Sequence, residues 1–490
     1  MRMVSKWRLM AILAVMALVA GACGGSGTAT TEAATTTAAE TTTTAGSTET
    51  TAAAGDKIQV RWFVGLGAGG QPEQITAQEA VVAAFNESHD DIEIVLEIIE
   101  NEVAYDTLAT QLASGNPPDI IGPVGRDGSN SYAGQFLDLE PLIEATGYDV
   151  SRWPEATVAN FREPDGTLPG LPFASFPSFV YFNTELFDEA GLPYPPQEYG
   201  PDGTAIYGEG TEFEGVWDFN KVAEIAQILT VDGNGNDGTS PDFDPTQTVQ
   251  WGFVWQWTDR LFQQGSFWGA GNALQPDGTA DIPEEWENEW RWYHDAVWNQ
   301  GFAPSQTQLD SELLAGNAFS SGNVGLAISH LWYTCCVRDD DGAGKDFFDI
   351  AVLPSNNGVV TAEIHADTFR ILKASQNPEA AFEVLTYLLG DAALDLLNAY
   401  GAAPADPALT EAFFTGLDET FPQGVNWQVA LDSANFADVP SHETFVPGWD
   451  EYKLRLGDLQ SALLSDPNLD LDTEIATVES DLTAVFQANG

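Results

Sequence analysis

Strand-like and helix-like patterns alternate along the first part of the chain that can build a core. Residues 57–64 (KIQVRWFV) and 92–99 alternate apolar and polar side chains, which is typical of β-strands. Residues 75–85 and 103–113 have helical spacing, and a third strand begins at Asp119. This alternation predicts an α/β fold with a largely parallel sheet. Ligands of such sheets bind in loops beyond the carboxyl ends of the strands.

The N-terminus predicts export. Three basic residues precede an apolar run from Leu9 to Ala20, which is too short to span a bilayer comfortably. The sequence AGAC follows and resembles the lipobox of bacterial lipoproteins, in which the cysteine carries the lipid. We therefore expect residues 1–22 to be a cleaved signal peptide and Cys23 to be the lipid anchor. The alternative is ordinary cleavage that leaves Cys23 as a free thiol.

A low-complexity segment separates this anchor from the rest of the chain. Residues 24–55 are nearly all Thr, Ala, Gly, Ser and Glu, a composition that cannot bury a core. We expect residues 23–55 to form an anchor and a disordered tether, with the protein held on the outer side of the cell membrane. About 435 residues follow, more than one ordinary core, so two lobes are expected.

The charge of the chain excludes one class of partner. It has 17 basic and 74 acidic residues, for a net charge of −57. Phosphate backbones are bound by basic patches, so nucleic acid is excluded as a partner. A strongly acidic surface keeps a protein soluble where salt screens its charges, which hints at a saline habitat.

Six segments occur in the order found in one known family. They are residues 85–97 (FNESHDDIEIVLE), 105–121 (YDTLATQLASGNPPDII), 179–192 (FVYFNTELFDEAGL), 217–230 (WDFNKVAEIAQILT), 320–332 (SSGNVGLAISHLW) and 365–390 (HADTFRILKASQNPEAAFEVLTYLLG). In this order they resemble the sugar-binding, extracellular solute-binding proteins of ABC importers, and 105–121 is the most specific. The resemblance covers most of residues 57–490. It implies a two-lobed, type II periplasmic-binding-protein fold, with mixed sheets flanked by helices and a ligand cleft between the lobes.

The same resemblance implies three crossings between the lobes, which we place near residues 172, 336 and 392. The first lobe would hold 57–172 and 337–391. The second lobe would hold 173–336 and 392–490. Binding would close the lobes on the solute by a hinge motion. An ABC permease would then accept the solute, and the binding protein itself is expected to be a monomer.

The 15 tryptophans are the clearest sign of a carbohydrate site. Tryptophan offers a flat apolar face with a donor edge, which suits the apolar C–H faces and polar rims of sugar rings. Many tryptophans are nevertheless core residues. Trp286, Trp290, Tyr293 and Val297 lie on one helical face, so we expect them to pack in the core, as we do Trp217.

Other aromatic residues lie in loops or at strand ends and are candidates for the ligand site. We assign Trp332 to the site because it ends a predicted strand near a hinge, where the resembled family places a ligand aromatic. Trp255 and Trp257 are predicted to share one face of a strand. For all four of Trp255, Trp257, Trp268 and Trp449, a position in the hydrophobic core is an equal alternative to a position in the ligand site. The aromatic candidates are Trp332, Tyr333, Trp255, Trp257, Trp268 and Trp449.

Four polar residues complete the predicted ligand set. His365 and Asp367 lie on a predicted loop that enters the sequence HADTF. Ser175 and Ser178 follow the first crossing. Ordinary loop capping is the alternative role for all four.

Residues 232–238 (DGNGNDG) are similar to a calcium-binding loop. Asp232, Asn234 and Asn236 have the alternate spacing of oxygen ligands for calcium. The glycine comes late, at 238, and Phe243 replaces the usual final glutamate. A plain polar turn is therefore favoured over a structural calcium site, and no other cofactor is expected.

Cys335 and Cys336 are adjacent, next to Trp332 and Tyr333. If Cys23 carries lipid, these two are the only thiols left, and outside the cell thiols tend to oxidise. They would pair with each other and form a rigid sulfur-faced wall for a sugar. The alternative is a pair of buried thiols that behave as small apolar residues.

A cell-anchored glycoside hydrolase is the rival class, since paired carboxylates would be its chemistry. With 74 acidic residues, some pair is always available. No nucleophile elbow or H-E-x-x-H motif occurs. We therefore expect a binding protein rather than an enzyme, one that reversibly binds a mono- or oligosaccharide and delivers it to a permease. A lipoprotein that senses sugar is a third reading.

Overall fold

The computed structural model describes residues 57–490, apart from 160, 164–165, 315 and 340–341. The predicted signal peptide, Cys23 and the tether lie outside the described residues and stay predictions. In the described part of the chain, no helix has the length and apolarity that crossing a bilayer requires.

The N-terminal elements follow the order that the periodicity predicts. They are β1 (Ile58–Val64), α1 (Pro72–Ser88), β2 (Ile92–Ile98), α2 (Asn101–Ala113) and β3 (Ile120–Val124). β1 is parallel to β2 and to β3. The predicted alternation of strand and helix is thus confirmed.

One mixed sheet continues from these strands through the rest of the protein. Its order is β2-β1-β3-β11-β4-β9-β8-β7, and β10 and β12 pair with β4. β11 is antiparallel to β3 and to β4, and β4 is antiparallel to β9. β8 is parallel to β9. The largely parallel arrangement predicted from the first strands therefore holds for β1–β3 and for the pair β8–β9, whereas the strands that join them are antiparallel. The strands concerned are β4 (Leu171–Asn183), β7 (Val231–Asp232), β8 (Thr248–Trp255), β9 (Val324–His330), β10 (Phe348–Ala351), β11 (Ile364–Ile371) and β12 (Ala403–Pro404).

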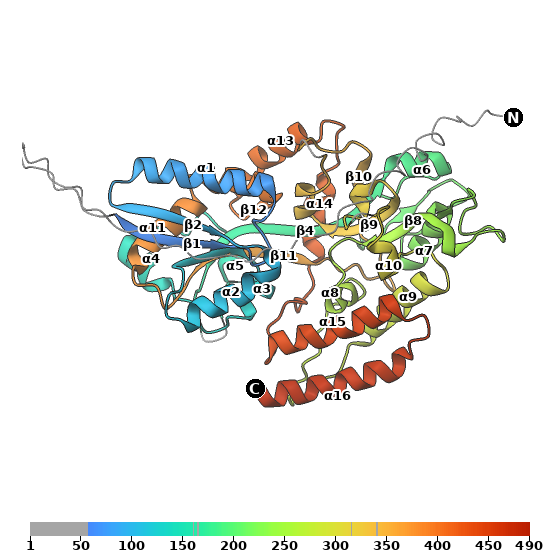
Figure 1. Ribbon diagram of the computed structural model, residues 1–490. Helices are drawn as coiled ribbons and strands as arrows, with labels where there is room; N and C mark the ends of the chain where they lie inside the picture. The colour runs from blue at the N-terminus through green and yellow to red at the C-terminus, as the bar shows by residue number, and fades with distance from the viewer. Residues whose placement is uncertain (1–56, 160, 164–165, 315, 340–341) are drawn as a thin grey trace, which may run out of the picture. The chain divides into compact units, whose positions relative to one another are not determined.

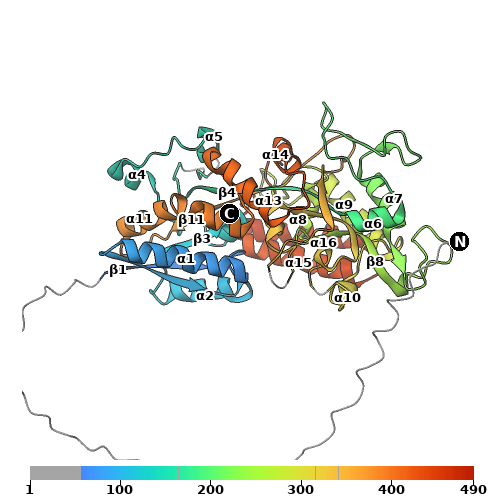
Figure 2. The same ribbon diagram turned by 90° about the horizontal axis from the view of Figure 1, so that it is seen from above.

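Strand β4 belongs to both lobes of the protein. Its N-terminal half, up to Pro177, pairs with β11 and β12. Its C-terminal half, from Ser178, pairs with β9 and β10. Figures 1 and 2 show the two groups of elements, with β4 running between them. We call the group around β1–β3 and β11 the first lobe, and the group around β8–β10 the second lobe.

The strand pairing bears on the predicted lobe boundaries. The segment 337–391 was assigned to the first lobe as a whole. β10, inside it, pairs with the second-lobe half of β4, whereas β11 pairs with the first-lobe half. β12, inside 392–490, also pairs with the first-lobe half. The first crossing lies inside the regular strand β4, so the chain shows no linker composition there. The exact boundaries stay a prediction.

Helices cover both lobes. Those of the first lobe are α1, α2, α3 (Arg126–Asn130), α4 (Glu140–Thr146), α5 (Glu155–Ala159), α11 (Pro378–Leu389) and α12 (Ala393–Tyr400). Those of the second lobe are α6 (Thr184–Ala190), α7 (Phe219–Leu229), α8 (Leu261–Ser266), α9 (Glu284–Trp298), α10 (Gln306–Leu309), α15 (Trp449–Ser465) and α16 (Leu471–Asn489). The remaining elements are α13 (Thr410–Thr420), α14 (Gln428–Ser433), the hairpin β5 (Ile206–Tyr207) and β6 (Gly215–Val216), and 3-10 turns at Pro245–Gln247, Phe319–Ser321, Leu331–Cys335, Pro407–Leu409 and Ala434–Phe436.

The core of the second lobe is rich in aromatic side chains. Trp286, Trp290, Tyr293 and Val297 of α9 are all buried, which confirms that this face of the helix packs in the core. Trp217 is also buried, and its indole Nε1 donates to Val352 O at 2.9 Å. The indole N–H groups of a packed core need acceptors. The aromatic residues of the second lobe that lie outside this core are therefore attached to a well-packed part of the protein.

Candidate functional site

Four roughly parallel rings line up where the lobes meet. The ring centroids of Trp257 and Trp332 are 6.2 Å apart at 13°, and those of Trp332 and His330 are 5.6 Å apart at 16°. His330 then stacks on His365, with 3.8 Å between centroids and an interplanar angle of 20°. We call these four residues the aromatic column. Because β8 and β9 are parallel, Trp257 and Trp332 follow their carboxyl ends, where ligands of such sheets bind.

Trp257 has two properties that favour a role in binding. Its side chain is 41% exposed, unlike those of most tryptophans in this protein. Its backbone φ is 56°, a conformation that is unfavourable for a bulky residue. Strain of this kind clusters at functional sites. Trp332 is half-buried next to it, so the pair offers flat apolar surface at the junction of the lobes.

Trp255 does not share a face with Trp257. β8 ends at Trp255, which is buried and donates from its Nε1 to Glu289 Oε1 at 3.1 Å. The chain then turns, because Trp257 adopts positive φ. The prediction of a common strand face is therefore wrong, and Trp255 belongs to the core of the second lobe.

The other aromatic candidates are not brought into the column. Trp268 packs on Phe219 at 4.9 Å between ring centroids and lies in the second-lobe core. Tyr333 is buried, and its hydroxyl accepts from Ser320 N at 3.0 Å. Trp449 is buried at the start of α15, where its indole faces the first lobe.

The four polar candidates lie in strands, so the loop positions predicted for His365 and Asp367 are wrong. His365 pairs with Phe176 and Asp367 with Ala174, between β11 and β4. Burial, with a smaller contribution from Glu443, raises the pKa of Asp367 to about 7.

The two serines lie on β4, on either side of the point where it passes between the lobes. Ser175 pairs with Ala366 of β11, and Ser178 pairs with His330 of β9. Ser178 is fully buried, and within the described residues its hydroxyl has no hydrogen-bond partner. Ser178 thus lies at the lobe junction next to His330 of the aromatic column, and His365 is itself a member of the column.

A cluster of three histidines and two glutamates shares His330 and His365 with one end of the column. It comprises His330, His365, His442, Glu363 and Glu443, and we call it the histidine–carboxylate cluster. His365 Nε2 and His442 Nε2 are 3.1 Å apart, and His330 Nε2 is 3.5 Å from Glu363 Oε2. Only His365 was singled out from the sequence, because the other members are scattered along it and come together through the order of the strands.

Burial and charge act differently on the three histidines. Burial lowers the pKa of His330 and His365 well below the ordinary value, which keeps both rings neutral. Burial also opposes the charged form of His442. The carboxylates of Glu363 and Asp438 outweigh that effect and raise its pKa to about 10. Asp438 Oδ2 lies 2.7 Å from His442 Nδ1.

An ion-pair group joins the two lobes on one side of the cluster. Asp127, in α3 of the first lobe, contacts Arg260 and Lys453 of the second lobe, and Lys453 Nζ is 2.8 Å from Asp127 Oδ1. Trp449 Nε1 donates to the Asp127 carbonyl at 3.1 Å. We call these four residues the interlobe clamp. Burial alone would raise the pKa of the Asp127 carboxyl, but Arg260 and Lys453 hold it well below its usual range.

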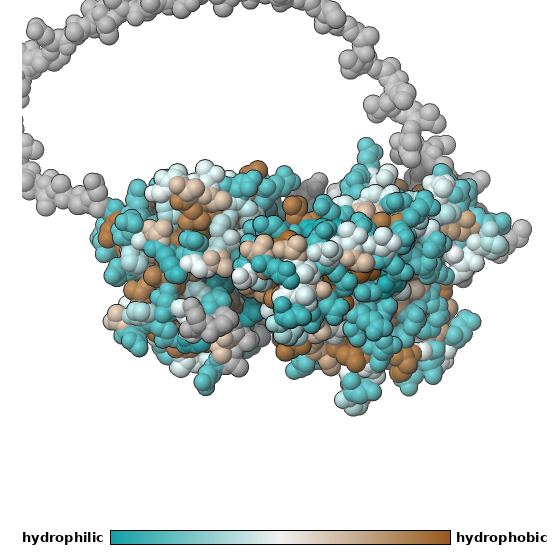
Figure 3. All heavy atoms as spheres, turned by 90° about the horizontal axis from the view of Figure 1, so that it is seen from below, coloured by the Kyte–Doolittle hydropathy of each residue, from teal (hydrophilic) through white to brown (hydrophobic). Residues whose placement is uncertain are grey.

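The protein surface has a groove next to the clamp. A groove of about 520 Å³ runs between α8 and α15 and includes Arg260 and Lys453. In the space-filling view of Figure 3, the surface is hollowed where the two lobes meet. The clamp thus lies at the edge of a concave region rather than on a flat face.

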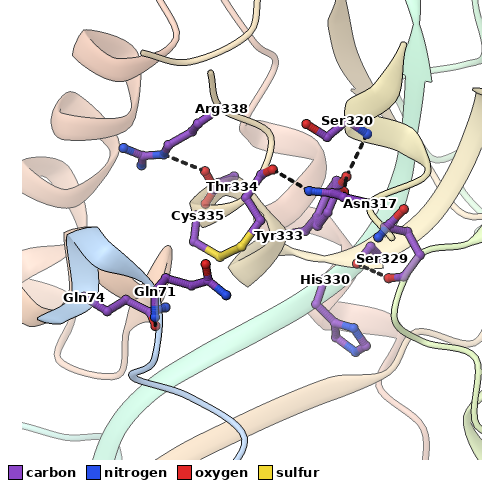
Figure 4. The surroundings of a disulfide bond; sticks show 12 residues. Gln71, Gln74, Asn317, Ser320, Ser329, His330, Tyr333, Thr334, Cys335 and Arg338 are labelled. Carbon is purple, nitrogen blue, oxygen red and sulfur yellow. Dashed lines mark hydrogen bonds between the residues drawn. A yellow bond between two sulfur atoms is a disulfide. The ribbon is translucent and has the colours of Figure 1, made fainter. Parts of the chain in front are cut away.

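Cys335 and Cys336 are joined by a disulfide in the turn that follows β9. Asn317 Nδ2 donates to Cys336 O at 2.9 Å, and Arg338 Nε donates to Thr334 O at 3.1 Å. Figure 4 shows Gln71, from the first lobe, beside the sulfur atoms, while the ring of His330 points away from them. The disulfide therefore faces the first lobe across the junction.

The loop at residues 232–238 closes on itself. Asp232 Oδ1 accepts from the backbone N–H of Asn234 at 2.8 Å and of Asn236 at 2.9 Å. Asp232 Oδ2 accepts from Asn236 Nδ2 and from Asp244 N, both at 3.0 Å. These bonds engage both carboxylate oxygens as in a polar turn. Calcium binding here stays a prediction that a calcium titration would test.

Comparison with known proteins gives the family. The model of the bacterial extracellular solute-binding proteins matches residues 69–394, about two thirds of the chain. The chain belongs to this family. The six segments that resemble it therefore reflect membership, and this solute-binding protein has the two-lobed fold of the periplasmic binding proteins.

Solved structures with the same fold are distant in sequence. An ABC substrate-binding protein from Listeria monocytogenes, in complex with cycloalternan, is 18% identical; the match covers 88% of this chain and 99% of that chain, with a TM-score of 0.66. Maltose-bound MalE3 of T. maritima is 16% identical, with coverages of 87% and 99% and a TM-score of 0.64. UspC of M. tuberculosis is 20% identical, with coverages of 87% and 100% and a TM-score of 0.58. These likenesses show the fold of this solute-binding protein.

Proposed function

We propose that this solute-binding protein reversibly binds a mono- or oligosaccharide between its lobes, without turnover, and delivers it to an ABC permease. The observation that carries the proposal is the parallel pair Trp257 and Trp332 beyond the carboxyl ends of β8 and β9. Flat indole faces at this position suit the apolar faces of sugar rings. The cycloalternan and maltose held by two proteins of the same fold support a carbohydrate ligand.

Other groups near the tryptophan pair supply what a sugar also needs. The Cys335–Cys336 disulfide forms a rigid apolar wall in the turn that carries Trp332. Gln71 faces this wall from the first lobe and offers an amide to sugar hydroxyls (Figure 4). In this proposal the sugar stacks on the second lobe and is hydrogen-bonded by the first lobe as the lobes close.

The cellular arrangement is part of the same proposal. Cys23 carries the lipid that holds the protein on the outer face of the membrane, and residues 23–55 are the tether. The protein acts as a monomer, and lobe closure presents the loaded form to the permease. The interlobe clamp favours this closed arrangement, because its ion pairs form only when the lobes are together.

The test is a fluorescence titration with a panel of saccharides that includes maltose, mannobiose and cycloalternan. A saturable change in tryptophan fluorescence is expected, with the saccharide recovered unchanged. Trp332→Ala should weaken binding by about 1–3 kcal/mol, in line with other aromatic stacking sites. Trp298→Phe is the control, because Trp298 ends α9, donates from its Nε1 to Leu463 O of α15, and is not part of the column.

Two results would overturn the proposal. One is a saturable response to another solute class, such as peptides or anions, with none to the saccharide panel. The other is hydrolysis of labelled oligosaccharide, which would make the protein an enzyme. An unchanged affinity in folded Trp332→Ala would remove Trp332 from the site.

A further inference from the structure

Three of the five histidines of this chain meet in one buried place. His330 ends β9, His365 lies in β11, and His442 lies in the segment before α15. His330 is fully buried, and His442 is 3% exposed. The other two histidines are not part of the cluster: His89 caps the C-terminus of α1, and His294 lies in α9. Histidine is uncommon in this chain, so this convergence needs a physical explanation.

Several polar atoms of the cluster lack hydrogen-bond partners. Both ring nitrogens of His330 and both carboxylate oxygens of Glu363 have no hydrogen bond of standard geometry among the described residues. Both side chains are fully buried. Burial of such groups without a partner is costly, and it is rare in native proteins. Within the described residues their contacts are long: His330 Nε2 is 3.5 Å from Glu363 Oε2, and His442 Nδ1 is 3.5 Å from Glu363 Oε1. A bound ion would satisfy these atoms better than such contacts do.

The ring nitrogens have the spacing of metal ligands. His365 Nε2 and His442 Nε2 face each other at 3.1 Å. Two imidazole nitrogens bound to one tetrahedral Zn²⁺ at about 2.0–2.1 Å would lie roughly 3.4 Å apart. The ligand atoms of His330, Glu363 and His365 lie within 4.8 Å of one another, and so do those of His365, His442 and Glu443. His365 belongs to both sets.

An outer partner orients one of these ligands. His442 Nδ1 lies 2.7 Å from Asp438 Oδ2. A proton on Nδ1, donated to Asp438, leaves the lone pair of Nε2 directed toward His365. Metal-binding histidines commonly have such a carboxylate on their other nitrogen. Ser266 Oγ in turn donates to Asp438 Oδ2 at 3.4 Å.

The charge of the cluster also calls for a cation. Glu363, Glu443 and Asp438 bring three buried carboxyl groups to the cluster. The nearby Arg260 and Lys453 are engaged by Asp127.

We propose that the histidine–carboxylate cluster binds one divalent transition-metal ion, with Zn²⁺ as the representative. Imidazole nitrogen with a few carboxylates suits zinc and its neighbours, whereas calcium and magnesium take oxygen ligands. The ion joins β9, β11 and the segment before α15 at the lobe junction. Because His330 stacks on Trp332, the ion lies directly beneath the surface proposed for the sugar. The metal site does not depend on that function.

The first experiment measures metal binding by the full-length protein after EDTA treatment and dialysis. Calorimetry with Zn²⁺ should give one ion per chain, and the melting temperature should rise with Zn²⁺ and fall on chelation. Co²⁺ should give the visible absorption of a cobalt ion bound by nitrogen and oxygen ligands. Wild-type protein that binds neither metal stoichiometrically would overturn the proposal, whether or not it binds a sugar.

The second experiment identifies the ligands. His365→Gln should abolish stoichiometric binding, because His365 belongs to both ligand sets. Asp438→Asn leaves every ligand in place and should weaken binding roughly 10- to 100-fold, as for other outer partners of metal-bound histidine. His89→Gln and His294→Gln are matched controls that should bind as the wild type does.

The outcomes of this comparison are decisive in both directions. Zn²⁺ binding that survives in folded His365→Gln, or that disappears in His89→Gln or His294→Gln, would place the metal elsewhere and refute the site. If His365→Gln fails to fold, the affinity of Asp438→Asn and its cobalt spectrum decide. An unchanged affinity and spectrum in Asp438→Asn would then count against the cluster.

Discussion

Replacing Asp127 by Asn should shift the protein toward an open arrangement of its lobes. The substitution keeps the shape of the side chain and an acceptor for Trp449 but removes the charge that attracts Lys453 and Arg260. These contacts are the charged part of the interlobe clamp. Asp127→Asn therefore tests whether the clamp holds the lobes together, and it needs no knowledge of the ligand.

The burial of each partner sets the expected size of the effect. The side chains of Asp127 and Lys453 are 14% and 19% exposed, so their charged hydrogen bond of 2.8 Å contributes about 1.5–3 kcal/mol. Arg260 is 46% exposed and contributes about 0–1 kcal/mol. A total of about 1.5–4 kcal/mol corresponds to a change of roughly 10- to 1,000-fold in the equilibrium between closed and open lobes.

Spin labels on the two lobes provide the assay. Val103 in α2 and Leu313 in the second lobe are exposed, so cysteines at these positions can be labelled. Asp127→Asn should add a population with a longer distance between the labels. Asp481→Asn is the matched control, because it removes an ion pair with Arg455 that stays within the second lobe. An identical distance distribution in Asp127→Asn and wild type would refute the role of the clamp.

The clamp also has a predictable pH dependence. The folded pKa of Asp127 is below its ordinary value of 3.8. A lowered pKa means that the stabilisation is present above pH 3.8 and is lost as pH falls toward the folded value. The wild type should therefore approach the label distances of Asp127→Asn only in acid below about pH 4.

Burial raises the pKa of Glu289 well above 4.5, so its contribution to stability is complete below pH 4.5 and is lost as pH rises through the folded value. In urea unfolding, the free energy of unfolding of the wild type should fall relative to that of Glu289→Gln by up to about 1.4 kcal/mol per pH unit above pH 4.5. The same pH dependence of this free energy in both proteins would contradict the prediction. Intact mass of the unfolded, unreduced protein should show no alkylation at Cys335 or Cys336, whereas two added groups would mean free thiols. Replacing both by serine should lower ligand affinity more than global stability. Cys23→Ser should release the protein from membranes or leave the signal peptide uncleaved, and normal membrane retention would defeat the lipid assignment.

Local patterns predicted the N-terminal elements and the buried face of α9. Periodicity is a local property, and residues such as Trp286 and Trp290 report their burial through spacing alone. The same reasoning failed for Trp257, because a two-residue spacing indicates a common face only while the strand continues. β8 ends at Trp255, and no glycine or proline follows that end before Gly265.

The site was less predictable than the elements around it. Trp332 was found because a family resemblance places an aromatic residue there. His365 and His442, 77 residues apart in sequence, come together only through the order of the strands and the path of the C-terminal segment. Asp127 and Lys453 are farther apart still. Contacts between distant segments carry no periodic signal, so the sequence alone did not reveal the cluster or the clamp.

Strand β4 has a consequence for how the protein can be made. Thr368 Oγ1 donates to Leu171 O across 197 residues, so the first lobe can complete its sheet only after most of the chain has been synthesised. Until then, β3 and β4 both have open edges that invite pairing with other chains. A fragment that ends at residue 330 would keep β4 but lack β11, and we expect it to aggregate rather than fold as an isolated lobe. Neither lobe can be separated from the other, because the sheet of each lobe contains one half of the same strand, β4.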